Sequence, residues 1–365
     1  MDGGEEEVSM TPRNRNLWLP LVAVSECIGD DAEYGPPAIT TNDVGALARF
    51  SADAIQFGFS VFEGMRAYVA DPSFLVFRAR DHHERLMASC AALELPCPAY
   101  EVFVEAIEQV VRANWDGGAT RLYLRPVVFS AGGDVMPQQD SRYIFVVLVK
   151  RFDPVLEGMS VLVEETMPRT VPMFAAVKTA GNYTSSALAM RKARRAGCDT
   201  ILWLDGNGHI QECTTMNVFL FLDGEIVTPK LGSILPGVTR KTVIELLTGS
   251  GERVVERDIR LSEVMDALAR RKSPVMFTTS TALGIQRVSR LRVGTEDHGL
   301  GDEMPSTLVR VGERYSELTE RFSTAGDEYA AMMARSHFGY LSGPNRGHEA
   351  RNTLPKGIEP EGTTT

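Results

Sequence analysis

The chain has few of the features that mark disulfide-linked, metal-binding or membrane-spanning proteins. Its 365 residues include five cysteines, which are scattered and form no CxxC pair, and six histidines, which form no HExxH array. This pattern indicates neither a disulfide framework nor a metal site. The sequence also has no apolar run long enough to cross a bilayer, so we expect no membrane association.

Motifs for nucleotide cofactors and positive charge are also lacking. We find neither GxGxxG nor a P-loop, so we expect no dinucleotide or nucleoside triphosphate cofactor. The 38 Lys and Arg residues are outnumbered by 48 Asp and Glu, and the net charge of -10 disfavours binding to nucleic acid. The acidic first residues do not resemble a signal peptide. These absences predict a reduced, cytoplasmic protein that acts on small molecules.

Length and composition favour two domains, since 44% of the residues are hydrophobic and can bury a large core. The segment Arg151–Gly158 contains Asp-Pro and interrupts the strand pattern, which predicts a domain boundary there. The expected parts are an acidic disordered tail over 1–15, a first domain over 16–152, a second domain over 158–323 and a largely disordered extension over 324–365.

Strand and helix patterns occur in both halves, which predicts an α+β fold. Two strands are expected over 61–69 and 74–77, separated by a turn at Asp71-Pro72-Ser73. A helix is expected from about Asp81 to about Leu95, with Glu84 placed as in a capping box.

In the second half, a helix is expected over 182–196, capped by Asn182 and closed by Gly197. Two hairpins are expected, over 201–212 around Asp205-Gly206-Asn207-Gly208 and over 218–228 around Asp223-Gly224. We therefore expect short hairpins rather than regular βαβ units in this half.

One lysine stands out because of its surroundings. Lys178 follows the apolar residues Ala176-Val177 and precedes a helix start, with the phenol of Tyr183 five places downstream. An apolar flank favours an uncharged amine, which is the form that attacks a carbonyl to make a Schiff base. A lysine that merely extends from a loop into solvent is the alternative, and for an isolated lysine it is the commoner situation.

Three elements of the sequence are suited to binding a phosphate. The turn Pro236-Gly237 leads into a helix, so the amides of Val238 and Thr239 face outward at a positive helix end. Arg85 lies on a helical face of small residues, and Thr278–Ala282 places hydroxyl groups after a strand. In addition, Glu212 ends an apolar strand, where its carboxylate lies either in a cavity or in solvent. A Schiff-base lysine, a phosphate cradle and a buried carboxylate are together what pyridoxal phosphate requires.

At this point the chain resembles the class IV, fold-type IV pyridoxal-phosphate aminotransferases, whose fold is that of D-amino acid aminotransferase. Within them it is most similar to branched-chain amino acid aminotransferases. The motifs that carry the resemblance are Val61–Tyr68, His83–Leu86, Leu122–Pro126, Lys178–Tyr183, Glu212–Phe219 and Leu235–Arg240.

The resemblance implies a role for each matching residue. Lys178 would form the Schiff base with the cofactor, Tyr183 would bind the phenolic oxygen of its ring, and Glu212 would pair with its pyridinium. Phosphate binding is implied for Arg85, Val238, Thr239 and Thr281. Substrate binding is implied for Phe62, Gly64, Tyr123, Arg125, Thr215, Ala282 and Leu283. The resemblance further implies a homodimer and transfer of an amino group from Leu, Ile or Val to 2-oxoglutarate.

Two positions depart from the family pattern. Phe57 stands where a tyrosine is frequent, and Leu283 replaces a small residue in the usual Gly-Thr-Ala-Ala. One extra branched side chain changes discrimination between substrates by about 1–3 kcal/mol. Two sets of alternatives therefore stay open: a D-amino-acid or amine aminotransferase or an aminodeoxychorismate lyase of the same fold, and a catalytically silent binding relative.

Overall fold

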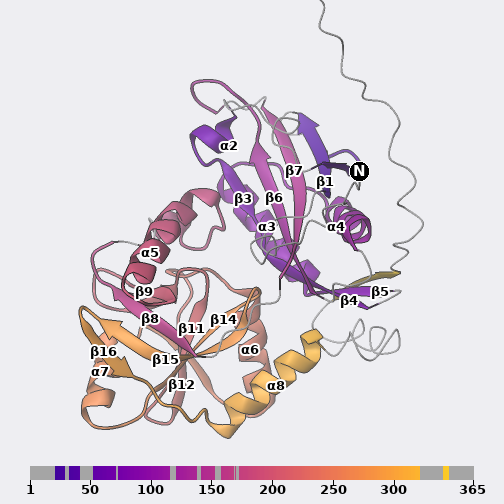
Figure 1. Cartoon of the computed structure of the whole chain (residues 1–365). Coiled ribbons are helices and arrows are strands. Elements are labelled where there is room, and N and C mark those ends of the chain that lie inside the picture. Colours follow the sequence, from indigo (N-terminus) through magenta and orange to yellow (C-terminus); the bar gives the residue numbers. More distant parts are fainter. Residues whose placement is uncertain are drawn as a thin grey trace, which may run out of the picture.

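The structure, a computed structural model, describes residues 21–28, 33–41, 52–70, 73–115, 121–137, 141–152, 158–167, 169, 172–320 and 340–344. Figure 1 shows that they form two lobes, each built on one sheet. Three predicted parts lie wholly or largely outside the described residues: the tail over 1–15, the middle of the domain boundary at 153–157, and most of the extension over 324–365. No helix among the described residues is long and apolar enough to cross a membrane.

The N-terminal lobe is an antiparallel sheet with helices packed on one face. Its strand order is β17-β5-β4-β6-β7-β1-β2, and β3 pairs with β6. The strands are β1 (Leu21–Ile28), β2 (Ala38–Thr41), β3 (Ser60–Phe62), β4 (Met65–Ala70), β5 (Ser73–Phe77), β6 (Arg121–Ser130), β7 (Arg142–Arg151) and β17 (Tyr340–Pro344). The helices are α2 (Asp53–Gln56), α3 (Ala79–Ala92) and α4 (Tyr100–Asn114).

Strand β6 shows how this lobe separates its core from its open face. Its residues alternate between buried and half-buried, because successive side chains of a strand point to opposite sides. Leu122 and Leu124 join the core together with Phe103 of α4. Tyr123 and Arg125 lie on the other face, which is turned towards the second lobe.

The strand expected over 61–69 is interrupted, and this part of the prediction is wrong. Both β3 and β4 pair with β6, but Glu63 and Gly64 between them lie outside the strands. The break falls at Pro126 of β6, which has no backbone N–H to donate to the ladder. Its carbonyl accepts a hydrogen bond from the Glu63 amide at 2.8 Å. The register with β6 stays the same on both sides of the break, from Phe62 opposite Val127 to Met65 opposite Leu124.

Helix α3 also differs from its prediction. It begins at Ala79, without a side-chain cap, and the Asp81 carboxylate pairs with Arg78 and Lys241 instead of forming the expected capping box. The helix ends at Ala92, earlier than expected, because Glu94 has a positive φ of 53° that cannot continue it.

The C-terminal lobe contains a sheet in the order β10-β9-β8-β15-β14-β11-β12-β13, with β16 paired to β15. Its strands are β8 (Met159–Glu164), β9 (Thr200–Leu204), β10 (Ile210–Cys213), β11 (Asn217–Leu222), β12 (Glu225–Pro229), β13 (Val254–Arg257), β14 (Val275–Ser280), β15 (Gly284–Val293) and β16 (Glu296–Gly299). Its helices are η2 (Pro172–Phe174), η3 (Ala180–Asn182), α5 (Tyr183–Arg195), α6 (Val238–Gly249), α7 (Leu261–Ala269) and α8 (Ser306–Glu320).

Both predicted hairpins are confirmed, because β9 pairs antiparallel with β10 and β11 with β12. The expectation that regular βαβ units are absent is wrong. Strands β8 and β9 are parallel and α5 connects them, while β12 and β13 are parallel and α6 connects them. Parallel neighbours need such crossovers, and these two crossovers bring the lysine segment and the start of α6 to the same side.

Asn182 precedes α5 as predicted, but its side chain does not cap the helix. Its amide group donates to the carbonyls of Phe174 and Val177, at 2.9 and 3.0 Å. These bonds hold the segment before Lys178 in a compact turn. Gly197, with a φ of 67°, follows the end of the helix as expected.

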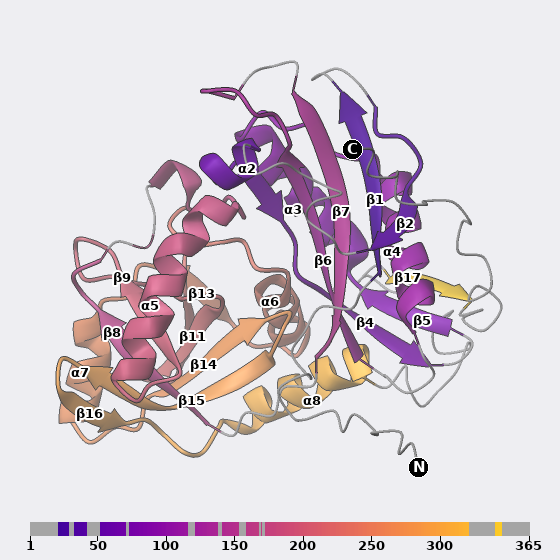
Figure 2. The same ribbon diagram turned by 45° about the horizontal axis from the view of Figure 1, so that its top comes forward.

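The end of the described chain returns to the first lobe. Figure 2 shows β17 beside β5, and the two strands pair antiparallel from Tyr340 opposite Phe77 to Pro344 opposite Ser73. This strand lies within the stretch for which we predicted a largely disordered extension. Pairing with β5 supplies backbone hydrogen bonds that its own sequence does not predict.

Candidate active site

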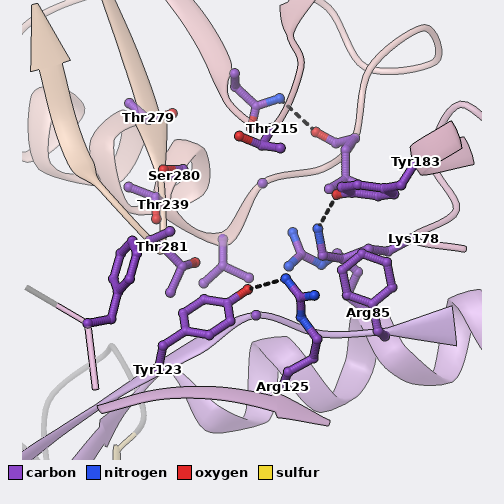
Figure 3. Close-up of a pocket in the computed structure, with 18 of the residues that line it drawn as sticks. Arg85, Tyr123, Arg125, Lys178, Tyr183, Thr215, Thr239, Thr279, Ser280 and Thr281 are labelled. Carbon is purple, nitrogen blue, oxygen red and sulfur yellow. Dashed lines mark hydrogen bonds between the residues drawn. The ribbon is translucent and has the colours of Figure 1, made fainter. Parts of the chain in front are cut away.

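A cavity of about 230 Å³ lies between the two lobes (Figure 3). All predicted site residues except Glu212 and Leu283 line it: Phe62, Gly64, Arg85, Tyr123, Arg125, Lys178, Tyr183, Thr215, Val238, Thr239, Thr281 and Ala282. The lining also includes Lys150 and Phe152, which the prediction missed, and five residues of the predicted motifs that had no individual role assigned: Asn217, Leu235, Gly237, Thr279 and Ser280. Lys150 pairs with Tyr123 across the sheet, so their strand register carries a signal for this position.

Lys178 reaches the centre of the cavity between two aromatic rings. Its Nζ atom donates a hydrogen bond of 2.6 Å to the Tyr183 hydroxyl, and lies 4.9 Å from the centre of the Phe62 ring. The backbone around it is tied to the first lobe, because the Lys178 amide donates to Ser89 Oγ at 3.1 Å and its carbonyl accepts from the Phe62 amide at 3.0 Å. The amine is therefore held at the junction of the lobes.

The start of α6 forms the polar end of the cavity. Gly237 precedes the helix, which has no side-chain cap, so its first amides face the cavity beside Val238 and Thr239. A Cβ atom at Gly237 would lie 2.0 Å from Asn217 Oδ1, so no larger residue fits there. The buried Thr279 hydroxyl on the same side has no hydrogen-bond partner among the described residues. These groups together have the chemistry that suits a phosphate.

Arg85 enters the cavity already bound to a buried carboxylate. Its Nε and Nη2 atoms donate to the two oxygens of Glu63, each at 2.7 Å, and its Nη1 donates to the Pro236 carbonyl at 3.0 Å. His82 Nδ1 lies 2.8 Å from the same carboxylate and donates to it. Burial raises the pKa of Glu63, but the charge and hydrogen bonds of Arg85, helped by His82, outweigh this and hold it well below the ordinary 4.5.

We predict that Glu63→Gln will destabilise the protein by about 3–5 kcal/mol at neutral pH, because it leaves the buried Arg85 charge without its partner. Urea unfolding measures the loss. Because the pKa of Glu63 is lower in the folded state, its carboxylate stabilises the fold fully at any pH above its pKa in the unfolded chain. This stabilisation is lost as the pH falls through the pKa of the folded state. Wild type should therefore lose this advantage over the variant between about pH 5 and the acid extreme. Glu84→Gln, exposed on α3, is the control, and equal stability of all three proteins at pH 7 would contradict the assignment.

Glu212 lies behind the main cavity, in an adjoining small one that shares Tyr183, Thr215, Asn217 and Leu235 with it. Its carboxylate accepts hydrogen bonds from Asn217 Nδ2 at 2.8 Å and from the Leu235 amide at 3.1 Å. Arg169 forms an ion pair with it at 2.5 Å. Burial raises the pKa of Glu212, and Arg169 and the Leu235 amide partly offset that shift.

The prediction did not find Arg169, because no local motif marks that segment as part of the site. Its Nη1 atom also donates to the Ala175 carbonyl at 3.1 Å. Arg169 therefore links Glu212 to the chain just before Lys178.

The wall formed by the first lobe is aromatic and cationic. Arg125 lies over the Phe62 ring at 4.9 Å and donates to the Tyr123 hydroxyl at 3.3 Å. A Cβ atom at Gly64 would lie only 2.4 Å from the Tyr123 hydroxyl, so a larger residue there would force the Tyr123 ring to move. Across the cavity, the Ala282 carbonyl accepts a hydrogen bond from Arg66.

The two positions that depart from the family pattern do not line this cavity. Leu283 lines a neighbouring cavity of about 490 Å³ together with Arg66 and Tyr315. Phe57 is 44% exposed. The cavity next to Lys178 is therefore shaped by neither of these side chains.

Pyridoxal phosphate fits the residues present. The Thr279 hydroxyl, which has no partner among the described residues, lines the same cavity as the uncapped start of α6, and these groups suit a phosphate. Glu212, buried beside Arg169, has a carboxylate that would suit a protonated ring nitrogen. Lys178 lies in the same cavity as the start of α6 (Figure 3), and Glu212 lies in the adjoining one.

Comparison with known proteins agrees with this geometry. The family model described as amino-transferase class IV matches residues 60–291. The chain is 34% identical over 272 residues to a probable branched-chain-amino-acid aminotransferase of Staphylococcus aureus, covering 71% of this chain and 74% of that one. It is 35% identical over 284 residues to branched-chain-amino-acid transaminase 1 of Bacillus subtilis, covering 74% and 79%.

Among solved structures, the T.th. branched-chain amino acid aminotransferase with pyridoxamine 5'-phosphate superposes with a TM-score of 0.67 at 27% identity, covering 85% of this chain and 97% of that chain. The fold is thus that of a fold-type IV aminotransferase. From the matched family and these relatives, we conclude that the chain belongs to the class IV aminotransferases.

Proposed function

We propose that this enzyme uses pyridoxal phosphate to transfer the amino group of a branched-chain L-amino acid to 2-oxoglutarate, as a homodimer in the cytoplasm. One observation supports the proposal above all others. Lys178 Nζ is hydrogen-bonded to the Tyr183 hydroxyl in a cavity whose polar end is the start of α6. The names of the relatives support the substrate class.

The cofactor would be held at both ends by residues already in place. Arg85, Thr279 and the amides of Val238 and Thr239 would bind its phosphate, and Glu212 would hold the proton on its ring nitrogen. When bound, pyridoxal phosphate supplies an aldehyde that exchanges amino groups and a ring that withdraws electrons.

Lys178 would move the proton of the reaction. Its Nζ atom would accept a proton from the α-carbon of the donor and deliver that proton to the cofactor carbon that receives the amino group. The Tyr183 hydroxyl at 2.6 Å keeps Nζ directed into the cavity. Arg169 stabilises the charged form of Glu212, and that carboxylate would favour the charge distribution that makes the α-proton acidic.

The wall near Phe62 would receive the substrate. Its ring and that of Tyr123 offer an apolar surface to an aliphatic side chain, and the Arg125 guanidinium beside them can bind a carboxylate. This combination suits donors with an aliphatic side chain and an acidic acceptor.

We expect the purified enzyme to form glutamate from L-leucine and 2-oxoglutarate, and not from D-leucine. The measurement is glutamate produced in parallel reactions that differ only in the leucine enantiomer. Glutamate from the D-isomer alone would assign a D-amino-acid aminotransferase instead. Protein that stays colourless after incubation with pyridoxal phosphate would assign a catalytically silent relative.

A further inference from the structure

Helix α3 belongs to the first lobe, yet it carries two arginines that bind the second lobe. One of them lies on the helix and the other at its start. Arg85 donates to the Pro236 carbonyl, directly before α6. Arg78, at the start of α3, lies about two helical turns from Arg85 and so on the same face of the helix. The site described above uses Arg85 but leaves the role of Arg78 open.

Arg78 connects the two lobes away from the cavity. Its Nη1 atom donates to Glu245 Oε2 at 2.7 Å and to Thr242 Oγ1 at 3.0 Å, both on α6. Its Nε atom donates to Asp81 Oδ2 at 2.7 Å, within α3. The Arg78 guanidinium is buried, with 2% of the residue exposed, while the carboxylates of Glu245 and Asp81 keep part of their surface in solvent. Lys241 of α6 strengthens the same contact through Asp81.

A short chain of hydrogen bonds leads from Arg78 to the phosphate end of the cavity. Thr242 Oγ1 accepts from Arg78 and donates to the Val238 carbonyl at 3.0 Å. Val238 is the first residue of α6 and lines the cavity. Arg78 is therefore linked, through Thr242, to the same turn of α6 that presents its amides to the ligand.

The backbone of Arg78 is also unusual. Its φ of 54° and ψ of 41° place it in the left-handed region of backbone conformation, which residues other than glycine rarely adopt. Glycine would relieve this conformation, but it would supply no guanidinium to reach α6. Arg78 thus holds a strained backbone conformation, and the contact that its side chain makes with α6 offsets this strain.

We infer that Arg78 is a positioning residue for the phosphate of the cofactor. By clamping α3 to α6, it fixes the distance between Arg85 on one helix and the amides of Val238 and Thr239 on the other. Both halves of the phosphate site depend on this spacing, although Arg78 does not line the cavity. The inference rests on the proposed use of pyridoxal phosphate.

The test compares two ligands that differ only in the phosphate. Dissociation constants of pyridoxal phosphate and of pyridoxal are measured by absorbance titration of the cofactor-free protein, for wild type and Arg78→Met. We expect the variant to bind pyridoxal phosphate about tenfold more weakly, the effect common for residues that hold a ligand-binding group in place. Pyridoxal, which has no phosphate to place, should bind both proteins equally.

Matched variants separate this role from general damage. Arg80→Met removes the same side chain from another face of α3, where Arg80 lies over the Tyr100 ring at 4.2 Å, and should leave both constants unchanged. Glu245→Gln removes the partly exposed carboxylate that pairs with Arg78, and it should weaken pyridoxal phosphate binding in the same direction but by less. This variant replaces Arg78→Met in the test if Arg78→Met does not fold. In an Arg85→Met background, the effect of Arg78→Met should shrink, because both act on one phosphate site.

The outcomes are distinct. Equal weakening of both ligands in Arg78→Met, or no weakening of either, would overturn the positioning role. Wild-type protein that binds neither ligand would overturn the proposed function instead.

Discussion

Replacing Lys178 with alanine should abolish transamination. We expect the rate to fall by at least about 10⁴-fold, because the proposed function gives this one side chain both the attachment of the cofactor and the transfer of the proton. The visible absorbance of the bound cofactor should change at the same time, since Nζ of Lys178 is the lysine nitrogen that contacts Tyr183 within the described cavity. Glutamate formation from L-leucine measures the rate.

Two controls accompany this variant. Lys272→Ala removes an exposed lysine that pairs with Asp223, and it should keep full activity. Borohydride reduction of wild type followed by peptide mapping should place the cofactor on Lys178. A label on another lysine, or normal turnover by Lys178→Ala, would refute the assignment of this residue.

Glu212→Gln is expected to have the second largest effect. The neutral amide cannot stabilise a protonated ring nitrogen as a carboxylate does, so we expect kcat to fall by about 10²–10³-fold. The fold should persist, because the amide oxygen can still accept hydrogen bonds from Asn217 and Leu235. Steady-state kinetics with L-leucine measures the loss, and unchanged kcat would show that Glu212 does not pair with the ring.

Arg169→Met tests the same carboxylate by its titration. Burial raises the pKa of Glu212 and Arg169 opposes that shift, so removing Arg169 should raise this pKa further. Because the ionised carboxylate is the active form, the acidic limb of the kcat profile should move to higher pH. A profile that stays in place while kcat falls would mean that Arg169 supports only the local structure. Arg257→Met, which breaks the half-exposed pair with Glu263, provides the matched control.

The local pattern of the chain was sufficient for several elements. The hairpins around Asp205–Gly208 and Asp223-Gly224 follow from turn residues with positive φ, such as Gly224 at 90°. The start of α6 after Gly237 follows from the same kind of short-range signal. Lys178, Tyr183 and the α6 amides could be predicted because each lies in a contiguous motif.

Contacts between distant parts of the chain could not be predicted in this way. Arg85 meets Glu63 and Pro236, and Arg169 meets Glu212, only because the lobes and the two parallel crossovers bring them together. Strand β17 pairs with β5 although nothing in its composition indicates that partner.

The residue types and their order along the chain thus determine the family and suggest the chemistry, because a lysine beside an apolar run and a helix start are recognisable within a few residues. Folding decides how the charges are partnered. A buried carboxylate or guanidinium must find its counterion wherever the packing of the lobes places one, and that position cannot be read from neighbouring residues. For this reason the clamp of Arg78 on α6 and the pairing of Glu212 with Arg169 emerge only from the tertiary structure.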